Sequence, residues 1–457
     1  MCYHLVENHL KFNSFLNAIA KPARINIIGG TLMTFKVIET FSGIGAQAKA
    51  LERIKEKNPS FDYEIVATCE WEIGAAYAYD IIHHGKQNLD KYNQYNKDDL
   101  VQILSKYNLS SNGKEPMSPT ALRHLDTQHL KAILHSIEKN NNLVDITQVH
   151  AEDLPDADML TYSFPCQDLS ISGFWWNNKS GIDPTSGNRS SLLWQIGRIL
   201  TEYRILNKRL PKFLLMENVT QIESPMHADN FNQWKRLLRE IGYTVNETFQ
   251  LNARNFGVPQ NRVRTFMVSV LGGENTTEIR DYLEQCGLEE RLEDPNMDAF
   301  LRLDYSNSEY LQEALESIPN YTPSRREIHR KASVLAYGNI LTGLTAKTIT
   351  TKQDRHPTAG VIEHELSLED ETLAPYRNLT PRETFLLMGF DEKDFQTLKD
   401  INFELLPSRP LIGMGKFLKL TGNSIVVNVL EGIFSEINKI DEIYFKTNNI
   451  VPFQRNA

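Results

Sequence analysis

The 457-residue sequence is poor in cysteine and lacks a long apolar run, and each absence excludes a class of protein. Its four cysteines, Cys2, Cys69, Cys166 and Cys286, are scattered and form no CxxC pair. They exclude a dense disulfide framework and a zinc site of the CxxC type, and they favour the reducing cytoplasm. We expect no metal, no signal peptide and no membrane association, because no apolar run approaches the ~20 residues that cross a bilayer.

A strong basic charge is also lacking, since the formal net charge is -9. A small protein that binds nucleic acid mainly through charge is basic, so a nucleic-acid partner here requires a local basic cleft. Hydrophobic residues make up 41% of the chain and charged residues 23%, which is typical of a globular enzyme. At roughly 100–200 residues per domain, the length predicts two or three domains.

The first 32 residues show no pattern that links them to the rest of the chain. Met33 directly precedes a predicted strand, and Gly29-Gly30, whose codons can spell a ribosome-binding sequence, lies just upstream. We interpret residues 1–32 as a non-native extension with Met33 as the native start. A genuine N-terminal arm is the alternative.

From residue 35 the sequence alternates between β-rich and helical segments. Residues 35–41 lead through a glycine turn into a helix that ends near Lys57, and residues 63–68 read as the next strand. Strand, glycine turn, helix and strand in this order predict a doubly wound α/β sheet. Further buried strands are predicted at residues 156–162, 213–216 and 265–270.

The rest of the chain departs from this alternation. Within a sheet domain over residues 33–270, residues 75–142 have apolar side chains at helical spacing and predict a helical insertion. The irregular, partly β texture of residues 271–375 predicts a second domain, which residues 376–421 complete. An apolar helical pattern opens the last segment, residues 422–457.

The glycine turn is the first candidate for chemistry. Gly43 and Gly45 permit positive φ and close approach of the backbone to a ligand, and a helix N-terminus follows. Glu70 ends the second predicted strand, where an acid suits a ribose diol. Together they favour a nucleoside-bearing cofactor over a purely structural turn. The absence of GxxxxGK excludes a P-loop.

Four reactive side chains follow or enter other predicted strands. Cys166 lies in a stiff proline-containing turn at a strand end, where open α/β sheets bind ligands; a small core cysteine is the alternative. Glu217 follows four apolar residues, so desolvation should raise its pKa; a helix-capping acid is the alternative. Arg262 and Arg264 alternate along an extended segment and should point to one side, toward Glu217; a solvated strand face is the alternative.

In this order and spacing, the segments resemble the cytosine-5 DNA methyltransferases of bacterial restriction–modification systems. The similar blocks are FSGIGA at 41–46, Glu70-Trp71, Asp145-Ile146-Thr147, FPCQDLSISG at 164–173, MENV at 216–219, GVPQNRVR at 257–264, RNLTPRETFLLMGF at 377–390 and TGNSIVVNVLEGIF at 421–434. The resemblance implies a Rossmann-like methyltransferase sheet that uses S-adenosylmethionine, with a second, smaller target-recognition domain at 271–375. It also implies that the last helix returns to the catalytic domain.

The resemblance assigns the cofactor contacts by position. The methionine end would lie against the glycine turn, the ribose against Glu70, and the adenine between Trp71 and the pair Asp145-Ile146. The full set of implied contacts is Phe41, Gly43, Gly45, Glu70, Trp71, Asp145, Ile146, Pro165, Leu192 and Asn423. The gap between Glu70 and Asp145 is longer than the family norm because of the insertion.

The implied chemistry has its own physical logic. Cytosine C5 becomes nucleophilic when a thiolate adds to C6, and a carboxylic acid near N3 stabilises the charge that this addition pushes onto the ring. By position, Cys166 is the nucleophile, Glu217 is the acid, Arg264 holds the base and Glu217, and Arg262 supports Arg264. The cytosine must leave the duplex stack to reach Cys166.

The resemblance also assigns contacts to DNA. Ser172 and Arg189 belong to a catalytic loop that closes over the duplex, and the doublet Thr348-Ile349 precedes the specificity loop. Side chains with donors for the major groove follow this doublet: Thr351, Lys352, Gln353, Arg355 and His356. Among them, Lys352 and Arg355 are the residues that we expect to read bases.

The predicted function is therefore site-specific methylation of cytosine C5 in double-stranded DNA, protecting host DNA in a restriction–modification system. We expect a monomer on DNA and a cognate restriction endonuclease that acts separately. A cytosine-5 methyltransferase acting on tRNA is one alternative, but the long variable segment favours duplex DNA. A catalytically silent DNA-binding relative is another, but the intact set of Cys166, Glu217, Arg262 and Arg264 favours an enzyme.

Overall fold

The structure is a computed structural model that describes residues 34–166, 169, 181–183, 189–355, 358–364, 366, 370 and 372–446. The chain divides into two compact units, Met1–Thr34 and Phe35–Ala457, and the fold below is that of the second unit. The expected extension, residues 1–32, and Met33 lie outside the described residues.

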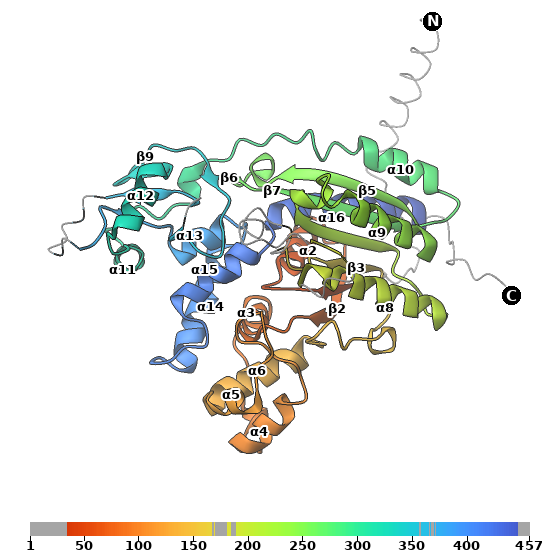
Figure 1. The fold of residues 1–457 in the computed structure, drawn as a ribbon, viewed down its shortest axis with the longest axis horizontal. Helices are drawn as coiled ribbons and strands as arrows, with labels where there is room; N and C mark the ends of the chain where they lie inside the picture. Colours follow the sequence, from red (N-terminus) through yellow and green to blue (C-terminus); the bar gives the residue numbers. More distant parts are fainter. Residues whose placement is uncertain are drawn as a thin grey trace, which may run out of the picture. The chain divides into compact units, whose positions relative to one another are not determined.

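A six-stranded sheet forms the centre of this unit (Figure 1). Its strands, in spatial order, are β2 (Tyr63–Cys69), β1 (Phe35–Thr40), β3 (Met159–Tyr162), β4 (Phe213–Val219), β7 (Val263–Leu271) and β5 (Tyr243–Asn252). The first four are parallel, whereas β7 runs antiparallel to both of its neighbours. This arrangement confirms the predicted α/β class.

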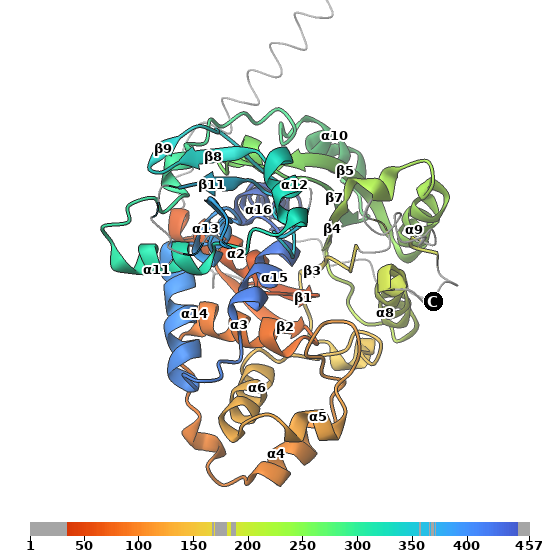
Figure 2. The same ribbon diagram turned by 60° about the vertical axis from the view of Figure 1, so that its left-hand side comes forward.

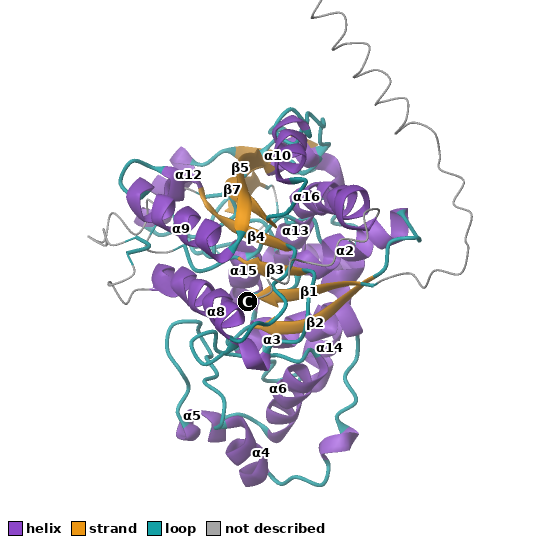
Figure 3. Ribbon diagram, turned by 90° about the vertical axis from the view of Figure 1, so that its right-hand side faces the viewer, coloured by secondary structure: helices purple, strands orange, loops and turns teal. Residues whose placement is uncertain are grey.

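Helices cover both faces of the sheet, as Figure 3 shows. Successive strand residues point to opposite faces. Accordingly, Met159 and Phe213 join the core beneath one helical layer, and Leu160 and Leu214 join the core beneath the other. The first layer contains α2 (Ala46–Lys57), α3 (Ile73–His84) and α16 (Val427–Ile440), and the second contains α8 (Leu193–Ile205) and α9 (Ala228–Ile241). Double burial explains why the central strands read as near-continuous apolar runs.

The helical insertion forms a subdomain with its own core (Figure 2). It comprises α4 (Lys97–Leu104), α5 (Pro119–Arg123) and α6 (Thr127–Lys139), and α6 packs on α3. The predicted start at residue 75 lies inside α3, whose Tyr77, Ala78 and Ile81 are buried in the core of the sheet domain. The insertion therefore begins after α3, where the helix ends at Gly85 with a positive φ.

Residues between 334 and 377 form a second, four-stranded sheet, in the order β12-β11-β8-β9. Its strands are β8 (Val334–Tyr337), β9 (Ile340–Leu341), β11 (Val361–Glu363) and β12 (Tyr376–Arg377), with α11 (Ser308–Glu316) and α12 (Pro323–Lys331) alongside. The pair β6 (Gln260–Asn261) and β10 (Ala346–Lys347) joins this segment to the sheet domain. The predicted boundary at residue 271 precedes α10 (Thr276–Gln285), which packs back on β5 through the sheet-domain core.

The C-terminal part consists of helices that return to the sheet. They are α13 (Pro381–Leu386), α14 (Glu392–Leu405), α15 (Met414–Asn423), α16 and a π-helical turn, Asp441–Lys446. The helix predicted from residue 422 begins at Val427, because the chain is extended between α15 and α16. By length and composition alone the run Met414–Lys446 can cross a membrane, but 61% of its apolar window is buried in the protein, as expected of a core helix.

A buried carboxyl group on β1 lies behind the glycine turn. Glu39 is fully buried, and among the described residues neither carboxyl oxygen has a partner in ordinary hydrogen-bond geometry. Burial raises the pKa of Glu39 to about 8, although the Tyr79 hydroxyl and the Ala48 amide partly offset this effect. An unfolded chain would ionise Glu39 near pH 4.5, so between these two values the folded protein holds more protons.

This difference predicts how stability depends on pH. The contribution of Glu39 falls as pH rises from about 4.5 to about 8, by at most ~1.4 kcal/mol per pH unit. Glu39→Gln keeps the shape without the charge, so urea unfolding should show a variant more stable than the parent at pH 8 and nearly equal to it at pH 4.5. Equal stability at both pH values would contradict a protonated Glu39.

Candidate active site and cofactor site

Cys166 lies four residues beyond the end of β3, at the carboxyl edge of the parallel strands. Two hydrogen bonds to backbone carbonyls hold its turn: the Ser190 hydroxyl donates to Pro165 O (2.7 Å), and Asn218 Nδ2 donates to Phe164 O (3.0 Å). Ser190 lies in the short helix Arg189–Leu192, which follows the catalytic loop in the chain. Asn218 lies on β4, the strand that pairs with β3. The thiol is thus presented by a fixed turn rather than packed as a fully buried core side chain.

Glu217 lies on β4, the next strand, immediately after the residue that pairs with the last residue of β3. Burial raises the pKa of its carboxyl group, while the charges of Arg264 and Arg262 lower it. Arg264 Nε lies 3.5 Å from Glu217 Oε1. Burial also raises the pKa of the Cys166 thiol, the Glu217 charge raises it further, and the two arginines oppose both effects. Thiol, carboxyl and two guanidinium groups therefore form one electrostatic unit.

The hydrogen-bond partners of Arg262 lie outside the immediate site. Its guanidinium is buried and donates to three backbone carbonyls, Ile349 O (2.8 Å), Ser424 O (2.8 Å) and Gly422 O (3.2 Å). These carbonyls belong to the smaller domain and to the junction of α15 and α16. Arg262 thus ties the strand that carries Arg264 to two distant segments, and it contributes charge to the site without a direct bond to Glu217.

The glycine turn after β1 has the backbone that its sequence predicts. Phe41, Gly43 and Gly45 all have positive φ, at 56°, 57° and 79°. A Cβ at Gly45 would lie 2.1 Å from His83 Nε2, whereas no described atom lies within 4 Å of a Cβ at Gly43. Gly45 is therefore required by packing against α3, and Gly43 faces open space at the N-terminus of α2. Of these two glycines, only Gly43 has open space in which a ligand could approach it.

Glu70 closes this turn from the end of β2. Its Oε2 accepts the amide proton of Gly43 (3.0 Å), and its Oε1 accepts that of Glu72 (2.8 Å). Burial raises the pKa of Glu70 to about 7, so hydroxyl donors from a ligand would favour its charged form. An acid fixed beside an open glycine turn fits the ribose end of S-adenosylmethionine, and Trp71, Pro165 and Leu192 are partly exposed near these strand ends.

Asp145 and Ile146 lie in the segment that joins the insertion to β3. Asp145 is partly exposed, and its Oδ1 accepts from the Thr147 amide (2.9 Å) and hydroxyl (2.8 Å). Ile146 is buried beside Cys69 and Phe164 in the core under the second helical layer. Asn423 is the exposed last residue of α15, four residues before the start of α16 at Val427. Of these three residues, Asp145 is partly exposed, Ile146 is a core residue and Asn423 is exposed.

Comparison with known proteins decides the family. Residues 114–439 match the family described as C-5 cytosine-specific DNA methylase. The chain belongs to this family. Its members methylate DNA, so the enzyme is a cytosine-5 DNA methyltransferase that uses S-adenosylmethionine, as the sequence predicts in preference to the tRNA enzyme.

Relatives of this DNA methylase match over nearly their whole length. The orphan methyltransferase M.SssI of Spiroplasma monobiae is 32% identical over 88% of this chain and 97% of its own. The type II methyltransferase M2.ScrFI of Lactococcus lactis subsp. cremoris is 32% identical over 88% of this chain and 99% of its own. Among solved structures, Dnmt2 methyltransferase of S. pombe covers 90% of this chain and 100% of its own, with 17% identity and a TM-score of 0.53, which shows a shared fold.

The residues expected to read DNA are not equally accessible in this methylase. Lys352 and Arg355 are exposed, and Thr348 is half-buried, with its hydroxyl bound to Asn261 O (2.7 Å). Ile349 is buried, and its amide donates to Gln260 Oε1 (2.9 Å). Gln353, named only for its donors, is also buried and exchanges two hydrogen bonds with the Leu379 backbone.

The catalytic loop is described only at its ends. Ser172 and His356 lie outside the described residues, so their predicted contacts stay predictions. Arg189 is half-buried at the start of a short 3₁₀ helix, Arg189–Leu192, and its Nη1 donates to Gly113 O of the insertion (3.5 Å). In this structure Arg189 thus lies against the insertion.

Sequence reasoning missed an ion-pair cluster beside the cofactor site. Glu72 is buried, and its two carboxyl oxygens each lie 3.0 Å from a lysine of α15, Lys416 and Lys419. Lys419 also donates to Asn112 O (2.7 Å). The cluster joins the segment after Glu70 to the helix that ends at Asn423. No local signal announces it, because its members are more than 300 residues apart along the chain.

Proposed function

We propose that Cys166 is the nucleophile of this DNA methyltransferase and that Glu217 is its proton donor. The observation that supports these roles is their position on adjacent strand ends, where the charge of Glu217 acts on the thiol. Arg264 is the residue that holds Glu217, and we assign its remaining donors to the cytosine O2. Arg262 supplies charge and fixes the strand that carries Arg264.

The proposed reaction uses these groups in sequence. The Cys166 thiolate forms a bond to C6 of the flipped cytosine, and the electron pair of the C5–C6 double bond moves into the ring as Glu217 gives its proton to N3. S-adenosylmethionine, when bound, supplies the methyl group that C5 takes up. Loss of the C5 proton to a base then restores the double bond as the C6–S bond breaks, which regenerates the Cys166 thiolate, and N3 returns its proton to the Glu217 carboxylate. No residue is assigned to that last proton transfer.

The remaining assignments follow the same family pattern. The sheet domain, residues 33–270, would hold the cofactor at Phe41, Gly43, Glu70, Trp71 and Asp145, with Ile146 and Gly45 shaping the pocket. Residues 271–375 would recognise the target sequence, with exposed Lys352 and Arg355 reading bases and buried Ile349 positioning them. We further propose a monomer on DNA in the cytoplasm, with a cognate restriction endonuclease acting separately.

Glu217→Gln tests the proton donor. The amide keeps the size and the contact with Arg264 but cannot protonate N3, so we expect methyl transfer to fall by about 10²–10⁴-fold. The parent rate should fall as pH rises through the raised pKa of Glu217, because its protonated form is the donor. The variant should lose this fall and keep only the rise that accompanies ionisation of Cys166. Transfer of radiolabelled methyl groups to DNA between pH 5.5 and 9 measures both profiles.

A matched control is Glu240→Gln, on the exposed face of α9, which should leave rate and pH profile unchanged. Calorimetry with S-adenosylhomocysteine should show intact cofactor binding in both variants. A Glu217→Gln enzyme with the parent rate and the same alkaline fall would refute the proposed role.

A further inference from the structure

The helical insertion meets the sheet domain beside the two side chains proposed to contact the adenine. The insertion core contains residues of α4, α5 and α6 together with Ile73 and Val144 from the sheet domain. The partly exposed indole of Trp71 packs against this same core. Trp71 therefore takes its position from the insertion as well as from the strand that it follows.

The backbone of the insertion is fixed at the same place. The Ser110 amide donates to Trp71 O (2.8 Å), and Ser110 O accepts from the Ile73 amide (2.9 Å). The next turn of the insertion accepts Lys419 at Asn112 O (2.7 Å), so α15 is tied to it as well. Ser110 is fully buried, and this pairing sets the position of Asn108, two residues earlier.

Asn108 contacts the other proposed adenine residue. Its Nδ2 donates to Asp145 Oδ2 (2.8 Å), and Asp145 Oδ1 is already held by Thr147. The turn before Asp145 is constrained too. Val144 has φ of 64°, which is rare for a β-branched residue, and the Asp145 amide donates to Leu143 O (2.9 Å), which closes a γ-turn. Oδ1 thus accepts two hydrogen bonds and Oδ2 accepts one, so Oδ2 keeps a lone pair that can accept a further hydrogen bond.

We infer that the insertion forms the adenine side of the cofactor site and that its Asn108 is a positioning residue, which orients the Asp145 carboxylate toward the adenine amino group. This inference rests on the proposed function, which assigns Asp145 to the adenine. The Asn108–Asp145 bond is exposed, so it adds little to folding. The Asn108–Asp145 bond instead fixes the orientation of the Asp145 carboxylate. Without this bond, Asp145 Oδ2 is free to turn away from the ligand.

The test measures binding of a cofactor product, independently of methyl transfer. Asn108→Ala should raise the Kd of S-adenosylhomocysteine by about 3- to 10-fold in calorimetry, the loss expected of one hydrogen bond. The analogue with an inosine base replaces the amino donor by an oxygen that a carboxylate repels. The parent should therefore bind the adenine compound more tightly than the inosine compound, and Asn108→Ala should reduce this ratio.

Gln102→Ala, on the exposed face of α4, is the matched control and should change neither the Kd nor the ratio of the two Kd values.

Asp145→Ala distinguishes an error in the proposed assignment of Asp145 to the adenine from an error in the positioning role of Asn108. If Asp145→Ala leaves S-adenosylhomocysteine binding intact, the proposed assignment of Asp145 is wrong. If Asp145→Ala weakens binding but Asn108→Ala changes neither Kd nor ratio, only the positioning role is wrong. Addition of Asn108→Ala to Asp145→Ala should have no further effect, whereas an additive loss would contradict the coupling. Thermal unfolding of each variant checks that the fold is intact.

Discussion

Cys166→Ser is expected to reduce methyl transfer by on the order of 10⁴-fold or more and to abolish covalent capture of DNA. A serine hydroxyl is a far weaker acid than a thiol, so it supplies far less of the anion that attacks C6. Burial and the Glu217 charge raise the pKa of the Cys166 thiol, and the charges of Arg264 and Arg262 oppose this rise, but no such balance makes a hydroxyl ionise near neutral pH.

Serine should leave the architecture of the turn unchanged. The bonds that hold this turn are accepted by the carbonyls of Phe164 and Pro165, so the side chain at position 166 takes no part in them. Binding of S-adenosylhomocysteine and of duplex DNA should therefore resemble that of the parent. A large loss of rate with binding retained is the result that separates a nucleophile from a structural cysteine.

Mechanism-based capture gives the decisive measurement. A duplex that contains 5-fluorocytosine at the target has no C5 proton to lose, so the parent enzyme with S-adenosylmethionine should remain attached to it on a denaturing gel. Cys286→Ser is the control, since this half-buried thiol lies at the end of α10 and contacts Leu283 O (3.1 Å). Capture by the Cys166→Ser protein, or its loss in the Cys286→Ser protein, would overturn the assignment.

The sequence predicted the sheet well because burial on both faces leaves a clear pattern. The strands FKVIET and FLLM are continuous apolar or β-rich runs, and the glycines at 43 and 45 occupy positions with positive φ. Cys166 follows β3, as predicted, whereas Glu217 lies within β4, which continues to Val219 past the predicted end at Met216; parallel strands still bring both residues toward one edge. Local pattern was sufficient wherever the relevant neighbours are adjacent strands.

Prediction was weaker where the partner is distant along the chain. Arg262 was expected beside Glu217 from its alternation with Arg264, but its guanidinium instead binds backbone carbonyls between residues 349 and 424. Gln353 was named among the side chains with donors for the major groove, yet its amide exchanges hydrogen bonds with the backbone of Leu379. Polar side chains like these carry no local mark of burial, because their partners are set by tertiary packing alone.

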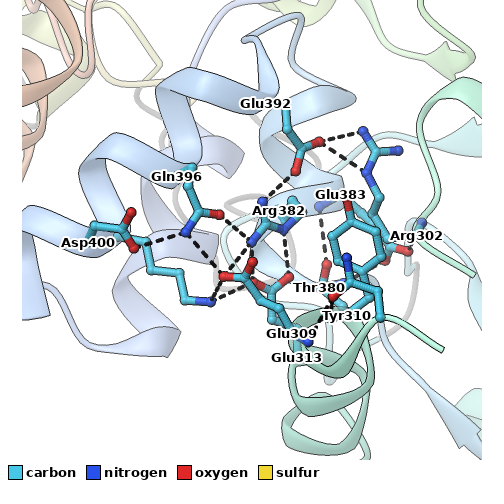
Figure 4. A network of polar contacts seen from close by, with 12 residues as sticks. Arg302, Glu309, Tyr310, Glu313, Thr380, Arg382, Glu383, Glu392, Gln396 and Asp400 are labelled. Atoms are coloured by element: carbon cyan, nitrogen blue, oxygen red, sulfur yellow. Dashed lines mark hydrogen bonds and ion pairs between the residues drawn. The ribbon is translucent and has the colours of Figure 1, made fainter. Parts of the chain in front are cut away.

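The sequence analysis assigned no role to the family-like block RNLTPRETFLLMGF at residues 377–390. The structure shows that it has a structural role. Arg377 and Glu383 form a fully buried bidentate pair, and Glu383 also closes a capping box with Thr380 at the start of α13. The Arg382 side chain contacts Glu313 on α11 and Gln396 on α14, so it joins α13 to these two helices (Figure 4). The block therefore organises the junction between the smaller domain and the C-terminal helices.

Arg382→Met is expected to lower the free energy of unfolding by about 3–5 kcal/mol. The guanidinium binds both carboxyl oxygens of Glu313 on α11, at 2.8 and 2.9 Å, and also contacts Glu392 and Gln396 on α14. Glu313 is buried, so removal of the arginine leaves a carboxylate in the interior with Lys399 Nζ (2.8 Å) as its remaining cation. Methionine restores apolar packing on Phe395 but cannot replace the charge.

The combined variant Arg382→Met with Glu313→Gln decides whether charge or packing causes the loss. Removal of both partners leaves no uncompensated carboxylate at position 313, so about half or more of the lost stability should return. Arg330→Met is the control: its pair with Glu327 lies on the exposed face of α12, where solvent screens it, so its loss should leave the stability almost unchanged. Urea unfolding followed by fluorescence and circular dichroism measures all three. If the double variant is no more stable than Arg382→Met alone, the loss comes from packing, and the buried ion pair does not hold these helices together.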